Sequence, residues 1–127
     1  MRIRSKIRTG VAALGMAVAG VALAAGPAAA GSNGNQIRFY DNDGTVYSVW
    51  VSGYNQNGQW VSNCFGTPHS TTNLDGWWWS GYVHIDAYHN SSCSGSWPDA
   101  GSNNVWINPD LPTDYHNVFY TNGKITG

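Results

Sequence analysis

The sequence contains no glutamate, and after residue 30 it has only two cationic side chains, Arg38 and Lys124. The other four lysines and arginines lie between Arg2 and Arg8, whereas all seven acidic residues are aspartates that follow residue 30. Two positive against seven negative side chains give residues 31–127 a formal net charge of −5. Binding to nucleic acid or to anionic lipid depends on clusters of basic residues. The sequence therefore disfavours both classes of partner.

The sequence also lacks the short motifs of common enzyme chemistries. It has no Gly-x-Ser-x-Gly, no His-Glu-x-x-His, no phosphate-binding loop and no dinucleotide fingerprint. Glycoside hydrolysis usually needs two carboxylates at a set separation, and a pairing of Asp86 with Asp75 or Asp99 stays open, although no spacing supports it. We therefore expect a protein that is not an enzyme and needs no cofactor.

Metal-binding patterns are equally incomplete. Asp41-Asn42-Asp43-Gly44 resembles the opening of a calcium loop, but the full motif needs further oxygen ligands and a bidentate acid. A plain hairpin turn is the favoured interpretation. His84 and His89 are five residues apart, which places them on opposite faces of a regular strand. They are poor joint ligands for zinc, and we expect no metal site.

The N-terminal 30 residues have the pattern of a secretory signal peptide. A basic start precedes an apolar stretch of Ala, Val, Leu, Gly and Met, and the small-residue site Ala28-Ala29-Ala30 follows. Cleavage is expected between Ala24 and Ala30. The apolar stretch is too short and too rich in Ala and Gly for a membrane anchor, and nothing after it resembles a membrane span. We expect residues 31–127 to form one secreted, extracellular domain with no membrane insertion after cleavage.

The two cysteines, Cys64 and Cys93, both lie in the part expected to be exported. We expect them to form a disulfide bond, because exported proteins meet an oxidising environment. Their 29-residue separation lacks the Cys-x-x-Cys spacing of a redox pair. Closing such a loop would stabilise the fold by about 3–4 kcal/mol at most on the chain-entropy estimate.

The pattern of residues after position 34 predicts an all-β protein. No helical period is long enough to indicate a helix, and Asp43-Gly44 and Asn57-Gly58 are typical hairpin turns. Some seven short strands at turn spacings of roughly ten residues predict a small antiparallel β-sandwich, Ig-like or jelly-roll-like, or a barrel. The strands are expected at Gln36–Tyr40, Thr45–Tyr54, Gln59–Phe65, Asp75–Tyr88, Asn104–Asn108 and Tyr115–Thr121, with a short tail over residues 124–126.

The stretch from Asp75 to Tyr88 is the most informative strand. Alternate side chains of a strand point to opposite faces. One face is apolar and is expected to meet the core: Trp77, Trp79, Gly81, Val83, Ile85 and Ala87. The other mixes aromatic with hydrogen-bonding groups: Trp78, Ser80, Tyr82, His84, Asp86 and Tyr88. The residues expected to bind a ligand are Trp78, Tyr82, His84, Asp86 and Tyr88, with Trp50 if the second strand lies alongside.

An alternative interpretation of this strand stays open. Trp78 and Tyr82 would then be core residues of a second packed face, as a central sandwich strand requires. However, 17 aromatic residues among Trp, Tyr and Phe are too many for a core of this size to hide. Some of them must be exposed, and an exposed Trp or Tyr is more informative about function than an exposed Leu.

In its aromatic surplus, scarcity of Lys and lack of catalytic motifs, the chain is similar in kind to carbohydrate-binding modules. In size and expected secretion and β-structure it is similar to the small amylase inhibitors, which have more cysteines and a Trp-Arg-Tyr run that this chain lacks at Val49-Trp50-Val51. Neither similarity covers a specific motif, so no site residue is taken from either. The leading expectation is a non-enzymatic domain that binds an extracellular polysaccharide. The alternatives are a secreted inhibitor or antagonistic factor that acts on another protein, and a cell-surface structural protein.

Overall fold

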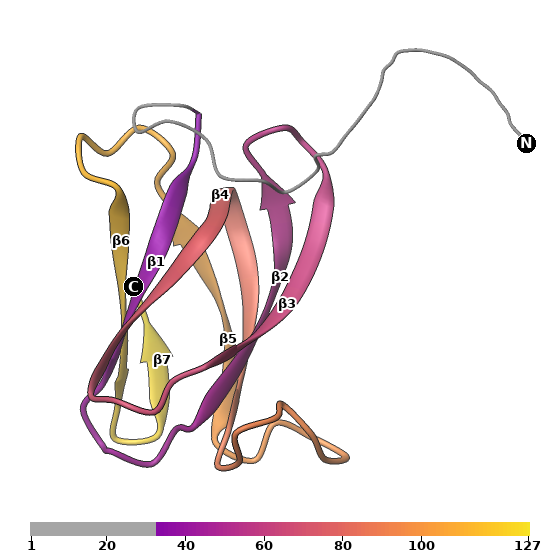
Figure 1. The fold of residues 1–127 in the computed structure, drawn as a ribbon, viewed down its shortest axis with the longest axis vertical. Helices are drawn as coiled ribbons and strands as arrows, with labels where there is room; N and C mark the ends of the chain where they lie inside the picture. The colour runs from indigo at the N-terminus through magenta and orange to yellow at the C-terminus, as the bar shows by residue number, and fades with distance from the viewer. Residues whose placement is uncertain (1–32) are drawn as a thin grey trace, which may run out of the picture.

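A computed structural model describes residues 33–127, so the expected signal peptide at residues 1–30 lies outside the described residues. The described part of the chain is all-β (Figure 1). Its strands are β1 (Asn35–Asp41), β2 (Ser48–Asn55), β3 (Trp60–Gly66), β4 (Thr71–Tyr88), β5 (Gly101–Ile107), β6 (Tyr115–Thr121) and β7 (Lys124–Thr126). Over these residues the structure has no helix long and apolar enough to cross a membrane.

The all-β class and nearly all of the expected strands are confirmed. The clearest differences are at the ends of two elements. β4 begins at Thr71, within a segment expected to be a loop, and the C-terminal tail forms the short strand β7. Gly66 to Leu74 contains a run of polar residues that resembles a loop, but pairing with β1 makes its second half the start of a strand.

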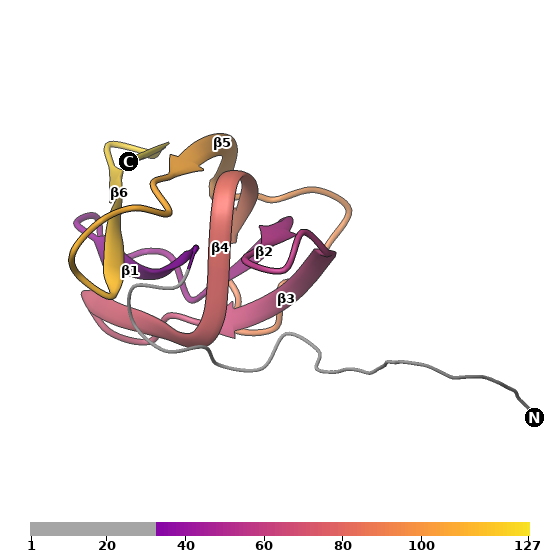
Figure 2. The same ribbon diagram turned by 90° about the horizontal axis from the view of Figure 1, so that it is seen from above.

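The seven strands form one mixed sheet in the order β3-β2-β4-β1-β6-β7, with β5 paired to β4. The long strand β4 is shared: its first residues pair with β1, and its second half pairs with β2 and β5. The sheet curls around a common interior, as the view along the strands shows (Figure 2). β5 and β7 come together where the Asn103 side chain donates a hydrogen bond to the Ile125 carbonyl oxygen at 2.8 Å.

This arrangement differs from the expected antiparallel sandwich in two ways. The structure has one continuous curled sheet instead of two separate ones, and β1 and β6 run parallel. Parallel neighbours cannot be joined by a tight hairpin. Residues from the whole middle of the chain therefore separate these two strands, and the sequence offers no local signal for their pairing.

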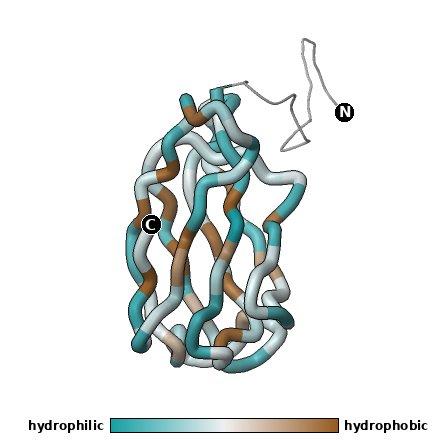
Figure 3. Tube along the Cα trace, turned by 90° about the vertical axis from the view of Figure 1, so that its left-hand side faces the viewer, coloured by the Kyte–Doolittle hydropathy of each residue, from teal (hydrophilic) through white to brown (hydrophobic). Residues whose placement is uncertain are grey.

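The core lies inside the curl and follows the alternation of each strand. Val83, Ile85 and Ala87 of β4 are buried, as expected, and face Val49 and Val51 of β2 on the adjacent strand. Hydrophobic and hydrophilic positions alternate along the strands in the hydropathy view (Figure 3). Burying a valine or isoleucine side chain is worth about 1.5–3 kcal/mol, and this gain determines which face of β4 points outward.

Two irregularities bend β4. Between Asn35 and Ile37 of β1 the partner residue jumps from Trp79 to Leu74, and between Gly53 and Asn55 of β2 it jumps from Val83 to Trp79. Extra residues on one strand of a pair form a bulge. Each extra segment contains a glycine with positive φ, Gly76 at 86° and Gly81 at 94°. Glycine adopts such angles without the steric cost that other residues meet. A glycine inside a predicted strand is a common site for a bulge, and both of these glycines occupy one.

The expected disulfide is also confirmed. Cys64 of β3 is bonded to Cys93 in the connection between β4 and β5, with Cα atoms 6.0 Å apart. The bond fastens this connection to the sheet. Disulfides persist in oxidising compartments, so the bond indicates that the protein folds or functions in such an environment.

Candidate ligand-binding site: an aromatic groove across four strands

Four neighbouring strands, β3, β2, β4 and β5, carry the candidate site on their outer face. Side chains directly opposite one another on paired strands point to the same face. The outward residues of β2 are Trp50, Ser52 and Tyr54, and the strand pairing sets Tyr54 opposite Trp60, Ser52 opposite His84 and Trp50 opposite Asp86. On the other edge of β4, Tyr82 lies opposite Trp106 and His84 opposite Asn104. The register therefore brings one row of aromatic residues and one row of polar residues side by side.

The aromatic row forms two pairs. The Tyr54 and Trp60 rings meet edge to face with centroids 5.1 Å apart, and so do the Tyr82 and Trp106 rings, also at 5.1 Å. All four side chains are 50–66% exposed. Between the pairs lies an open groove of about 640 Å³, whose other lining residues are Ser80, Gly81, Val83, His84 and Asn104. We call this the aromatic groove.

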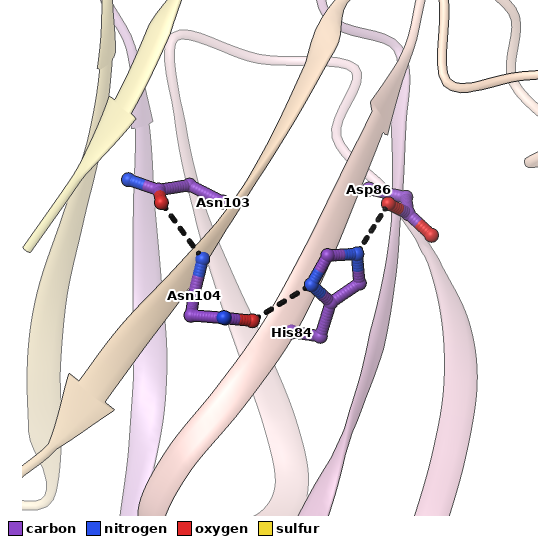
Figure 4. Close-up of polar contacts among 4 residues, drawn as sticks. All are labelled: His84, Asp86, Asn103 and Asn104. Carbon is purple, nitrogen blue, oxygen red and sulfur yellow. Dashed lines mark hydrogen bonds and ion pairs between the residues drawn. The ribbon is translucent and has the colours of Figure 1, made fainter.

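His84 is held in place on the polar side of the groove (Figure 4). Its Nε2 lies 2.9 Å from Asp86 Oδ1, and its Nδ1 lies 2.8 Å from Asn104 Oδ1. A carboxylate only accepts hydrogen bonds, so Nε2–H donates to Asp86. Asn104 is in turn positioned by its backbone N–H, which donates to Asn103 Oδ1 at 2.9 Å. The imidazole ring therefore has one fixed orientation beside the aromatic side chains.

Part of the hydrogen-bonding capacity of this network is left for a ligand. His84 contacts only Oδ1 of Asp86, and the second oxygen points away from the ring (Figure 4). This Oδ2 has no hydrogen-bond partner among the described residues. The network can thus offer one acceptor, Asp86 Oδ2, to a polar molecule beside the groove.

Of the six expected ligand-binding residues, the structure brings Tyr82, His84, Asp86 and Trp50 together on this face. Trp50 is partly exposed, and its strand neighbour on β4 is Asp86. The condition placed on its contribution, that β2 lies beside β4, is met.

Trp78 and Tyr88 are placed differently from the expectation that they would be exposed. Trp78 is only 7% exposed and Tyr88 only 8%. Trp79 and Val83 both belong to the core cluster and Trp78 does not, so Trp78 lies on the side of the strand away from the core yet is covered. The alternation of a strand does not predict which segments cover that side. The Tyr88 hydroxyl has a raised pKa because burial disfavours its charged form, with the nearby carboxylates of Asp86 and Asp99 adding to the effect.

Seven lining residues were missing from the expected site, and those with an aromatic ring or an amide are Tyr54, Trp60, Trp106 and Asn104. A local signal existed for Trp60, because the Asn57-Gly58 turn joins β2 to β3 and so brings Trp60 back to Tyr54. For Trp106 and Asn104, the alternation of β5 indicates which face is polar. The sequence has no local signal that β5 pairs with β4, and only this pairing brings the two side chains to the groove.

The turn at Asp41 to Gly44 has a structural role. The Asp41 carboxylate accepts hydrogen bonds from the backbone N–H groups of Gly44 and Val46, both at 2.9 Å. The Asp43 carboxylate accepts hydrogen bonds from Asn122 and Gly123 in the β6–β7 turn, at 2.9 and 2.8 Å. Backbone donors therefore occupy both carboxylates, and no group of three or more potential metal ligands occurs within residues 33–127.

A second exposed feature is the connection between β4 and β5, which projects from one end of the sheet (Figure 1). Its Trp97 is 69% exposed, more than any other large hydrophobic residue that the structure describes. The connection is held by the disulfide and by Asn90, whose Oδ1 accepts hydrogen bonds from the backbone of Ser92 and Ser94. Asp99 closes it by accepting a hydrogen bond from the His89 N–H at 2.9 Å.

Comparison of the chain with protein-family models, with curated proteins and with solved structures found no match. The fold and the site by themselves define a class: a disulfide-bonded all-β domain with an exposed aromatic groove on one face of a curled sheet.

Proposed function

We propose that the protein is a secreted, non-enzymatic domain that binds a carbohydrate in the aromatic groove. One observation carries the proposal: four half-exposed aromatic side chains from four strands flank one groove with a polar row beside it. Binding sites are typically concave and largely apolar, with a few well-placed polar groups. A sugar ring presents C–H groups that pack on aromatic faces and hydroxyl groups that bond to Asp, Asn and His.

The side chains of the aromatic groove should lose little conformational entropy when a ligand binds. Its side chains stand on paired strands, and each edge-to-face aromatic pair contributes about 0.5–1.5 kcal/mol beyond its buried area. Rings that already hold each other in place cost less to order around a ligand. This supports recognition of a rigid, ring-shaped molecule.

The polar row supports binding over catalysis. Ser52 lies opposite His84 in the strand register, the arrangement that a nucleophile and its base would need. However, both ring nitrogens of His84 are occupied, one by Asp86 and the other by Asn104. Neither nitrogen accepts a proton from the Ser52 hydroxyl, so that hydroxyl is not activated.

The proposal of secretion rests on the N-terminal sequence pattern, and the disulfide supports it. N-terminal sequencing of protein exported by a bacterial host would test it. A start between residues 25 and 31 is expected. Retention of the first 24 residues in the exported protein would contradict the proposed signal peptide.

The binding test is a pull-down of the purified protein on insoluble cellulose, chitin, xylan and peptidoglycan. Trp106→Ala removes one wall of the aromatic groove, and Trp97→Ala is the matched control because it removes an exposed tryptophan elsewhere. Retention on one polymer that Trp106→Ala loses and Trp97→Ala keeps would support the proposal. Absence of retention on all four polymers would contradict it.

A second candidate function is inhibition of, or antagonism toward, another protein. A single observation favours it: Trp97, followed by Pro98, is highly exposed on a connection that a disulfide and several hydrogen bonds hold in place. Tryptophan is enriched among the residues that dominate protein interfaces. This candidate predicts inhibition of a secreted glycosidase or protease that Trp97→Ala abolishes and Trp106→Ala does not. The third expectation is a cell-surface structural protein, for which we expect the aromatic side chains to be buried. It is disfavoured because eight large hydrophobic side chains are exposed.

A further inference from the structure

The aromatic groove lies on a surface without lysine or arginine. Arg38 is on β1, where its Nε donates to Asn73 Oδ1 at 2.8 Å and its guanidinium stacks 4.5 Å from the Tyr115 ring centre. Lys124 is on β7. Neither lines the groove. Over the described residues one arginine and one lysine stand against seven aspartates, so a ligand with carboxylate or sulfate groups would find no lysine or arginine in the groove.

The groove is instead suited to positive charge. The faces of Trp and Tyr rings carry negative potential and attract cations, Trp most strongly. Four such rings flank the groove, and Trp50 adds a fifth on the same face of the sheet. The basic group at the groove, His84, already donates its Nε2–H to Asp86.

Trp50 and Asp86 make the most specific feature. They lie directly opposite each other on β2 and β4, so their Cβ atoms are about 4.5–5.5 Å apart. Asp86 Oδ1 is engaged by His84, whereas Oδ2 has no partner among the described residues and points away from the imidazole (Figure 4). An ammonium group between the Trp50 ring and this oxygen would meet a π face on one side and a carboxylate on the other.

We infer that the ligand of the aromatic groove is a glycan with protonated amino groups, in which sugar rings pack in the groove and an ammonium group binds between Trp50 and Asp86. This inference rests on the proposed carbohydrate-binding function and specifies its substrate class. Charge complementarity distinguishes such a glycan from neutral and acidic ones.

The test is calorimetric titration of the purified protein with three oligosaccharides of equal length: a glucosamine oligomer, its N-acetylated form and a galacturonate oligomer. The glucosamine oligomer should bind about tenfold more tightly than the acetylated one, because a charge-assisted contact is then formed. The galacturonate oligomer should show no binding. Asp86→Asn should lower the affinity for the glucosamine oligomer about tenfold more than it lowers the affinity for the acetylated oligomer, because only the first loses a charge-assisted contact.

Asp114→Asn is the matched control, because it makes the same change in net charge at an exposed position before β6. It should leave all three affinities unchanged.

If Asp86→Asn does not fold, Trp50→Phe takes its place, since it keeps an aromatic ring but weakens the attraction for a cation. Equal affinity for the acetylated and glucosamine oligomers, or an affinity for glucosamine that Asp86→Asn does not alter, would overturn the inference while leaving the proposed function standing. If none of the three oligosaccharides bound, the result would instead contradict the proposed function itself.

Discussion

The indole ring of Trp106 lies against the bare backbone of Gly81: a Cβ atom at this glycine would come 3.4 Å from Cζ3 of the ring. Gly81 also has a φ of +94° within the β4 bulge. Gly81 therefore allows the bulge in β4 and also provides the surface against which the Trp106 ring packs at the edge of the aromatic groove.

Replacing Gly81 with alanine should affect both stability and binding. A side chain at such a φ costs about 1–2 kcal/mol, and relaxation of the bulge would displace the neighbouring Tyr82 and Trp106. Gly44→Ala is the matched control, because Gly44 has a φ of +72° but a Cβ atom added there would meet no other atom within 4 Å. Urea denaturation should show a similar loss of stability for both variants, whereas only Gly81→Ala should weaken retention on the polymer that the protein binds. Equal retention by the two variants would contradict the assigned role of Gly81.

The disulfide gives a second prediction. Cys64→Ala combined with Cys93→Ala should lower the free energy of unfolding by up to about 3–4 kcal/mol, because the bond closes a loop over a sequence separation of 29 residues. For a domain of this size each kcal/mol lowers Tm by about 4–8 °C. Calorimetric melting of the double variant, and of the wild-type protein with and without reductant, would measure the effect. An unchanged Tm in both cases would show that the bond does not constrain the unfolded chain.

The locations of the strands could be predicted from local signals, but their partners could not. Asn57-Gly58 and the alternation around Val105 and Ile107 indicate strands and their faces within a few residues of where they lie. The parallel pairing of β1 with β6 joins segments about 80 residues apart, and no turn in the sequence encodes it. The curled sheet therefore follows from packing across the whole domain.

The same distinction explains the candidate site. Tyr82, His84 and Asp86 share one face because they follow the last bulge of β4 in regular alternation. Trp78 lies outside the core cluster, as counting by two predicts, but it is only 7% exposed, because the face of a strand does not predict what covers that face. Trp106 completes the groove through the pairing of β5 with β4, which depends on contacts remote in sequence.

Three tyrosines provide a prediction about alkaline pH. Burial raises the pKa of Tyr120, whose hydroxyl donates to the Ala100 carbonyl oxygen at 2.6 Å, and burial likewise raises that of Tyr88. The Tyr115 pKa is raised first by its hydrogen bond to Asp75 and then by burial. A raised folded-state pKa means that the neutral group stabilises the fold. This contribution is complete below the unfolded value of about 10 and is lost as the pH rises through the folded-state values.

The unfolding free energy should therefore fall progressively above about pH 10. Tyrosinate absorbance should show a group of tyrosines that ionise late, together with loss of the folded state. Tyr120→Phe should reduce the amplitude of this late phase. Ionisation of all tyrosines in one step near pH 10, with the fold intact, would contradict the assignment.

The two walls of the aromatic groove yield a prediction about additivity. Trp60 belongs to the pair with Tyr54, and Trp106 belongs to the pair with Tyr82, so the two tryptophans share no ring partner in the free protein. Each substitution by alanine should weaken polymer binding about fivefold to tenfold, the loss of more than about 1 kcal/mol that is typical of a central aromatic contact. Because energies of groups without shared partners add, the double variant should lose the product of the two factors. Adsorption isotherms for the four proteins would measure this, with Trp97→Ala as the control for loss of an exposed tryptophan elsewhere. If either single substitution removed all binding and the second added nothing, the two walls would act as one unit, and the ligand would have to span the groove in a single rigid contact.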